Sequence, residues 1–188
     1  MTYYGASELA RSFRTVRGNT IQIAEEIPEE HYGFRAAPET RTVAQTLVHI
    51  ALAPRLQKQI HIIERRNTLE GFDFFGFVGP MHAEEAKPRT KAEILELLRA
   101  EGEDYAKALE AATESFLGEI VTQREGMTPP VKSRFEMLSA PKEHEMHHRA
   151  QLMLVERMLG ITPHLTRQMQ ERIAAMQAAG GAAPGAGR

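Results

Sequence analysis

The sequence predicts an all-α protein built as a four-helix bundle. Apolar residues recur at spacings of three and four over four long stretches, proline or glycine separates these stretches, and the alternation typical of strands appears nowhere. At 188 residues the chain is long enough for one domain with a proper core. We therefore expect four amphipathic helices packed on one another, with a long connection between the second and third.

The first helix is expected from about Ser7, a residue able to cap it, to Ile27. Pro28 ends it, because proline cannot continue a helix. The apolar face carries Leu9, Phe13, Val16, Thr20, Ile23 and Ile27. The stretch from Glu29 to Thr40, which contains glycine and proline, should be a connection.

The second helix should begin with the capping box Thr42-Val-Ala-Gln45. Pro54 should bend it or mark a local break. Its inner face would carry Gln45, His49, Leu52, Ala53, Leu56, Ile60 and Ile63. His49 is thus a single imidazole on an apolar face, whereas His61 lies about 120° round the helix and several turns away.

The stretch from Asn67 to Pro88 is expected to be an irregular connection, because glycines and prolines interrupt it. It holds four aromatic rings, those of Phe72, Phe74, Phe75 and Phe77. These rings either plug one end of the core or form a wall or lid over a functional site, or part of a subunit interface.

Two further helices follow, each with a capping box. The third should start at Thr90-Lys-Ala-Glu93 and the fourth should run from about Ser133 to Leu159. The third helix would bury Ile94, Leu98, Tyr105, Leu109, Ala112 and Phe116. Pro141 implies a kink or a late start in the fourth helix.

The chain beyond the fourth helix should add little to the bundle. Gly160 has the position of a C-cap, and Thr162-Pro163 should begin a short helix that reaches about Ala178. From Gln177 the sequence is rich in alanine, glycine and proline, as in a disordered tail. We therefore expect the bundle to span residues 1–165, and a helical extension with a tail to span residues 166–188.

Three histidines indicate a metal site in the bundle core. His144 and His148 stand four residues apart, so on a helix both imidazoles leave the same face. That face also carries Leu152 and Val155, so it should point inward, where His49 is the leading third ligand. Three protein ligands leave positions open for water or substrate, as in a catalytic metal site. The ion would be divalent zinc, nickel, iron or manganese. The alternatives are a histidine-rich surface and a core histidine at position 49.

The same stretch also matches the metalloprotease pattern H-E-x-x-H, in which Glu145 would be the general base. The metzincin extension is absent, because Gln151 and Leu154 stand where it requires glycine and histidine. A gluzincin would need a downstream acid such as Glu171, in the weakly patterned C-terminal segment. These proteases also use a strand to hold the peptide, and the sequence indicates none. A three-histidine site would leave Glu145 and His147 off the metal.

Composition narrows the classes of partner. The net charge of −2 and the estimated pI of 6.5 give no reason to expect nucleic acid or an anionic membrane. The chain has no cysteine, which fits a reducing cytoplasm and removes thiolate ligands and cysteine nucleophiles. We see no signal peptide, and no apolar run reaches the roughly 20 residues of a membrane span.

The sequence resembles the DinB/YfiT family of metal-binding four-helix bundles over roughly residues 5 to 165. The matching stretches are Arg41-Thr-Val-Ala-Gln-Thr-Leu-Val-His49-Ile-Ala, Arg89-Thr-Lys-Ala-Glu-Ile-Leu, and His144-Glu-Met-His-His148-Arg-Ala-Gln-Leu152. Ala150 replaces the glycine usual in the family's last pattern, a change that touches no ligand. The resemblance implies that His49, His144 and His148 bind a divalent metal and that the protein is a homodimer. It also implies thiol S-transferase or thiol-dependent isomerase chemistry.

Two functions therefore remain open beside the peptidase. The first is a metal-dependent enzyme, a transferase or hydrolase, most plausibly a transferase that activates a low-molecular-weight thiol toward a small-molecule substrate. The second is a non-catalytic metal-binding bundle with a partner-binding or stress-related role. The sequence assigns no catalytic residue apart from the metal ligands.

Overall fold

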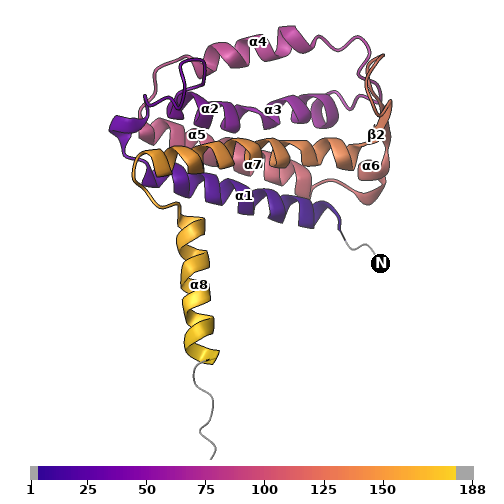
Figure 1. The fold of residues 1–188 in the computed structure, drawn as a ribbon. Helices are drawn as coiled ribbons and strands as arrows, with labels where there is room; N and C mark the ends of the chain where they lie inside the picture. Colours follow the sequence, from indigo (N-terminus) through magenta and orange to yellow (C-terminus); the bar gives the residue numbers. More distant parts are fainter. Residues whose placement is uncertain (1–3, 181–188) are drawn as a thin grey trace, which may run out of the picture.

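The computed structural model describes residues 4–180, and within that range the chain is mainly helical (Figure 1). In chain order the elements are α1 (Ala6–Glu26), the 3-10 turn η1 (Glu29–His31), α2 (Val43–Leu52), α3 (Pro54–Gln57), the π-helical turn η2 (Lys58–Ile63), α4 (Phe74–Glu85), α5 (Lys91–Glu110), α6 (Glu114–Gly118), β1 (Ile120–Thr122), β2 (Val131–Ser133), α7 (Arg134–Met158) and α8 (His164–Gly180).

Four long helical segments form the bundle, as predicted: α1, α2 with its continuation through α3 and η2, α5, and α7. Both α1 and the α2 segment contact α5 and α7, so α1 and α2 lie diagonally opposite each other. Figure 1 shows α4 running back along the length of the bundle. Because of this return, α5 starts at the same end as α2 and lies parallel to it. The arrangement is therefore not a simple up-down-up-down bundle, as the long second connection indicated.

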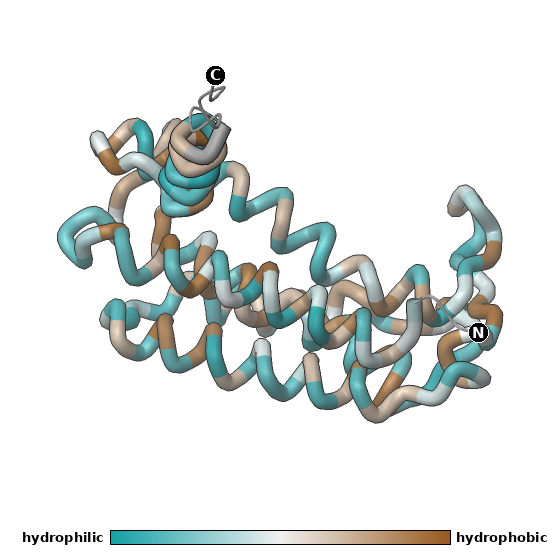
Figure 2. The backbone as a smooth tube through the Cα atoms, turned by 90° about the horizontal axis from the view of Figure 1, so that it is seen from below, coloured by the Kyte–Doolittle hydropathy of each residue, from teal (hydrophilic) through white to brown (hydrophobic). Residues whose placement is uncertain are grey.

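The core follows from the amphipathic helices. Figure 2 shows hydrophilic and hydrophobic residues alternating along each helix of the bundle. One buried cluster joins α1, α2, α5 and α7 and includes Ile23, Leu47, Leu98 and Leu152. A second lies toward the other end, around Phe13, Tyr105 and Leu138.

The predicted helix starts at Thr42, Thr90 and Ser133 are confirmed. In each case the hydroxyl accepts a hydrogen bond from the amide three residues later, over 3.1, 3.3 and 3.2 Å. Helix α1 differs from the prediction, because Gly5 and not Ser7 is its N-cap, with the Gly5 amide donating to Glu8. Gly160 ends α7 with a φ of +78°, as a C-cap glycine does.

Helix α4 corrects the expectation of an irregular connection from Asn67 to Pro88. Asp73 caps it, accepting a hydrogen bond from the Gly76 amide over 2.9 Å. None of the four rings expected to plug the core is buried, and Phe75 is 79% exposed. That core-plug interpretation is therefore wrong.

Other expectations also change. The helix expected to carry Phe116 ends at Glu110, and Phe116 belongs to the separate α6. Two short strands pair antiparallel, Val121 opposite Lys132, although no strand was expected. Each has only three residues, too few for an alternating pattern to stand out.

At the C-terminal end, α8 extends through Gly180, so residues 177–180 are helical and not part of a disordered tail. The rest of the predicted tail lies outside the described residues, and the division of the chain at residue 165 stays a prediction. Helix α8 projects away from the bundle (Figure 1). In residues 4–180, no helix combines the length and apolar character needed to cross a membrane.

Candidate metal centre

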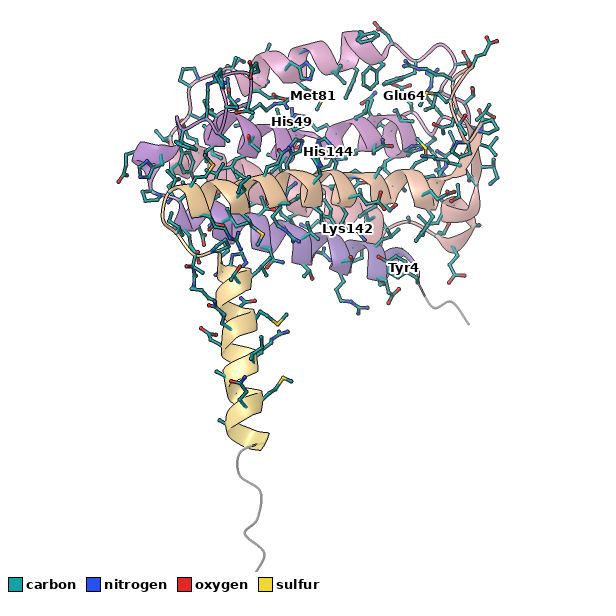
Figure 3. The ribbon with its side chains drawn as sticks, viewed as in Figure 1. Tyr4, His49, Glu64, Met81, Lys142 and His144 are labelled. Atoms are coloured by element: carbon teal, nitrogen blue, oxygen red, sulfur yellow. The ribbon has the colours of Figure 1, made fainter. Side chains whose placement is uncertain are left out.

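The fold brings the three predicted histidines together between α2 and α7. One ring nitrogen each from His49, His144 and His148 lies within 4.8 Å of the other two. The Nε2 atoms of His49 and His144 are only 2.8 Å apart. Figure 3 shows His49 and His144 facing each other between the two helices, with Met81 on the side toward α4. Within the described residues this is the one group of three or more metal-binding side chains.

A carboxylate and an arginine orient the ring of His49. Its Nδ1 atom lies 2.6 Å from Oε1 of Glu85, and Oε2 of Glu85 accepts a hydrogen bond from Arg41 Nε over 2.7 Å. Burial opposes ionisation of Glu85, but the hydrogen bonds from Arg41 and His49 outweigh it and lower the pKa of this carboxyl. The carboxylate therefore holds the His49 proton on Nδ1 and leaves Nε2 as a free lone pair.

Gln151 does the same for His148. Its Oε1 atom lies 2.8 Å from His148 Nδ1, one helical turn along α7. An amide oxygen can only accept, so it places the His148 proton on Nδ1 and turns Nε2 toward the other rings. The Gln151 amide nitrogen in turn lies 3.2 Å from His147 Nε2.

The protonation of the cluster suits a metal ion. Burial lowers the pKa of His49 and of His148, although the bonds to Glu85 and Gln151 partly oppose it. Burial and the neighbouring rings of His148 and His49 lower the pKa of His144 to about 4. All three imidazoles are thus mostly neutral at pH 7, the state in which histidine binds zinc, nickel or iron, and each offers a ring nitrogen within 4.8 Å of the others. The residues present fit a divalent ion.

The break at Pro54 leaves a backbone carbonyl of α2 free to accept a hydrogen bond from Arg17. Proline has no N–H, so the Ile50 carbonyl lacks its helical partner, and Arg17 Nη2 donates to it over 3.1 Å. The arginine also donates to the Leu98 carbonyl over 2.7 Å. Gly102 leaves room for it, since a Cβ there would lie 2.8 Å from Arg17 Cγ.

Glu145 lies in the core and not at the cluster. Its carboxylate accepts three hydrogen bonds from Arg17, at 3.0 to 3.1 Å, and both side chains are almost fully buried. A general base for peptide hydrolysis must reach the metal site. The carboxylate of the H-E-x-x-H pattern is instead committed to Arg17, so the peptidase interpretation loses its catalytic base.

The other histidines singled out in the sequence lie elsewhere. His61 is buried and its Nδ1 accepts a hydrogen bond from Arg134 over 3.1 Å, away from the cluster as expected. His147 is exposed on α7, beside the ring of His148.

Two pockets meet at the three histidines. One, of about 290 Å³, lies between α4 and the α2–α3 and α7 helices, and His49 and His144 form part of its wall. The other, of about 580 Å³, has His148 and Gln151 in its wall together with Arg41 and Thr46. The first is lined mostly by carbon, whereas the second has more polar lining. The wall interpretation of the aromatic segment therefore holds for Phe74, which lines the first pocket.

Sequence reasoning missed Glu85, because it lay in a segment that was expected to be irregular. Asp73, a residue type that often caps helices, was the available signal for that helix. Arg41 and Gln151 lay within the quoted stretches but had no assigned role. Only the three-dimensional structure shows that they orient the ligands.

Comparison with known proteins gives one family and several similar solved structures, two of which are YjoA and YfiT. The DinB family model matches residues 1–177. A DinB-like protein from Bacillus subtilis, YjoA, shares 21% identity at a TM-score of 0.59, and the match covers 82% of this chain and 94% of that one. YfiT from Bacillus subtilis shares 14% identity at a TM-score of 0.65, over 86% of this chain and 91% of that one.

YfiT is described as a probable metal-dependent hydrolase with an unusual four-helix bundle topology. At these identities the two structures support the fold alone. No curated protein matches the chain.

Proposed function

The chain belongs to the DinB family, and from that premise we propose that it is a metal-dependent enzyme that transfers a low-molecular-weight thiol to a second small molecule. The family and the three-histidine cluster fit a metal-dependent enzyme. The proposal goes further by naming a thiol as one substrate and transfer as the reaction.

One observation carries the transfer: the cluster lies where two pockets of different character meet. A divalent ion held by His49, His144 and His148 would supply Lewis-acid chemistry, lowering the pKa of a ligand thiol or water and polarising an electrophile. Hydrolysis needs one organic substrate and water, whereas transfer needs room for two organic molecules. The second pocket would give the second organic molecule a place beside the cluster.

The chain's own residues would align the two substrates. Glu85 and Gln151 hold two imidazoles in one tautomer and orientation, so these rings need no rearrangement during reaction. Two pockets lined by the same cluster would hold the two reactants close together, which reduces the entropic cost of bringing them together. In the transfer the thiol loses its proton to solvent, a sulfur–carbon bond forms, and the leaving group departs with its electron pair.

Hydrolysis is the second candidate, because YfiT is described as a probable metal-dependent hydrolase and shares this fold. The same ligands would serve it, with water in place of the thiol. A non-catalytic metal-binding bundle is the third. These three candidate functions differ in which reaction, if any, depends on the bound ion.

The first test is the metal content of protein purified without a histidine tag, measured by mass spectrometry. We expect about one ion per chain, lost in His49→Ala and His148→Ala with helical content unchanged by circular dichroism. His147→Ala is the matched control, because it removes a histidine of the same stretch and should keep the ion. Retention of the full metal content in His49→Ala would contradict the three-histidine site.

The second test is the reaction itself. Loaded protein is incubated with chlorodinitrobenzene and either cysteine, glutathione or a larger biological thiol, and the coloured conjugate is followed. Metal-dependent conjugation that disappears in His148→Ala supports transfer. Metal-dependent cleavage of aryl esters without thiol consumption would favour hydrolysis, and neither reaction with a tightly held ion would favour the non-catalytic bundle.

A further inference from the structure

The wall that α4 contributes to the smaller pocket is an apolar helix face that packs only partly against the rest of the bundle. Phe74, Val78 and Met81 are spaced four and three residues apart, so they share one face of α4, and all three line the pocket. No residue of α4 is buried. A helix face of this kind normally fills a core. Here it faces a cavity of about 290 Å³.

The opposite walls are also apolar. Ala53 and Leu56 from the α2–α3 segment and Pro141 from α7 complete the cavity, whose remaining lining includes His49 and His144 at one end. Met81 packs partly against the main core, and Figure 3 shows it on the side of α4 that faces His49. A molecule in this space would touch both the apolar helices and the cluster.

The carboxylate in the pocket wall already has partners within the protein. The one carboxylate in the lining, Glu85, is paired with Arg41 and with His49. Among the described residues the wall contains no lysine or arginine. In the metal-free protein a charged ligand would therefore lose its hydration without meeting a lysine, an arginine or an unpaired carboxylate in this lining, which is costly.

Gln57 supplies an unused hydrogen-bonding group. Its Oε1 atom is buried and has no hydrogen-bond partner among residues 4–180, and its side chain lines the pocket. An unpaired buried carbonyl is destabilising, and a hydrogen-bond donor on a ligand would remove that cost.

We propose that this pocket binds the acceptor substrate, and that this acceptor is an uncharged, mostly apolar small molecule that donates a hydrogen bond to Gln57. The inference rests on the proposed function, because it assigns one of the two substrates to one of the two pockets. The thiol, which carries charged groups in most biological forms, would then enter by the more polar pocket beside Arg41 and Thr46.

The test uses binding and not turnover, so that it can succeed even if the proposed reaction is wrong. Methionine methyl groups are isotope-labelled, and the Met81 signal, assigned with Met81→Leu, is followed by NMR in metal-free and zinc-loaded protein. The probes are benzyl alcohol, its near-isostere ethylbenzene, which has no donor, and the anion benzoate. Met169 and Met176, exposed on α8, serve as internal controls.

We expect saturable shifts of Met81 with both neutral probes in either metal state, and none with benzoate in the metal-free protein. Benzyl alcohol should bind about three- to tenfold more tightly than ethylbenzene. Gln57→Leu should remove that difference by weakening benzyl alcohol alone. Val78→Phe should fill the pocket and abolish both shifts, whereas Ala83→Phe, which adds the same ring at an exposed position of α4, should leave them.

Absence of saturable shifts with both neutral probes, or binding of benzoate to the metal-free protein as tight as that of benzyl alcohol, would overturn the inference. Equal affinity of the two neutral probes would overturn the role of Gln57. Neutral-probe binding in protein that retains no metal and performs no conjugation would support the pocket assignment while the proposed function fails. The two failures are therefore distinguishable.

Discussion

At the residue scale, the geometry of the cluster depends on a carboxylate that is not itself a ligand. Glu85 links Arg41 to His49 through two hydrogen bonds of 2.7 and 2.6 Å. Loss of a carboxylate that orients a metal-binding histidine typically reduces metal affinity or activity by about 10- to 100-fold. Glu85 is therefore as much a part of the site as the imidazoles are.

Glu85→Gln should weaken zinc binding by about 10- to 100-fold without unfolding the chain. The amide keeps the shape but loses the charge that favours the Nδ1 proton of His49. Competition with a chromophoric chelator measures the affinity. Glu96→Gln, an exposed glutamate of α5, is the control and should bind zinc as the wild type does. Unchanged affinity in Glu85→Gln would show that the negative charge of Glu85 does not matter to zinc binding.

A second prediction concerns Glu145, whose position separates a structural role from a catalytic one. Removing one partner of a buried ion pair leaves the other charged and unpaired, which typically costs about 3–5 kcal/mol. Glu145→Ala should lower the free energy of unfolding by about that amount in urea titrations. The double variant Arg17→Met with Glu145→Met should recover most of it, because no charge then remains buried. A stable Glu145→Ala protein that has lost only activity would instead favour the peptidase role.

At the element scale, helices with capping boxes and clear apolar faces could be predicted from the sequence, and α4 could not. The starts at Thr42, Thr90 and Ser133 follow from local hydrogen bonds that depend on four residues each. Helix α4 contains Gly76, Gly79 and Pro80, which weaken a helix, and buries no residue.

The residues of the candidate site also differ in how far the sequence could predict them. His144 and His148 are close in sequence and could be paired from helical spacing alone, and His49 followed from the apolar face that it shares. Glu85 reaches His49 from a helix whose position depends on the fold as a whole. A contact of that kind leaves no local pattern in the sequence.

The junction of α7 and α8 gives a prediction about pH. Glu156 of α7 is fully buried, and neither of its carboxylate oxygens has a hydrogen-bond partner among residues 4–180. Burial, and next the nearby carboxylate of Glu26 on α1, raise the pKa of Glu156 to about 7, although Arg167 of α8 and Arg157 oppose this. His164, the first residue of α8, is buried too, with its Nε2 atom 3.3 Å from Asn19 Oδ1 on α1.

Because the folded pKa of Glu156 exceeds that of an ordinary glutamate, the folded chain holds this proton more tightly than the unfolded chain does. Stability should therefore fall as pH rises from about 4.5 to 7, where only the unfolded state has released the proton. Glu156→Gln removes that loss, so it should gain on the wild type by about 2–3 kcal/mol between pH 5 and pH 8. Urea titrations at both pH values measure the difference. Glu143→Gln, at an exposed position of α7, should show no such trend.

At the scale of the whole molecule, α8 contacts the bundle only near its first turn. It projects from the bundle and exposes an apolar row whose members are four and three residues apart: Met169, Ile173 and Met176, which are 56%, 47% and 70% exposed. A helix that leaves one apolar face open usually packs it against another chain. The family resemblance implies a homodimer, and we propose that α8 contributes to its interface.

The substitution of both Met169 and Ile173 by glutamate should then give a monomer, because like charges would replace the apolar row on both copies. Sedimentation velocity at several protein concentrations measures the state, with the wild type expected to sediment as a dimer. Ala174→Glu together with Ala178→Glu adds the same charge to α8 outside that row and should leave the dimer intact. A wild-type protein that stays monomeric at high concentration would contradict the proposal. A dimer that survives the double substitution would place the interface elsewhere. Metal content should stay the same in every variant, because α8 contributes no residue to the histidine cluster.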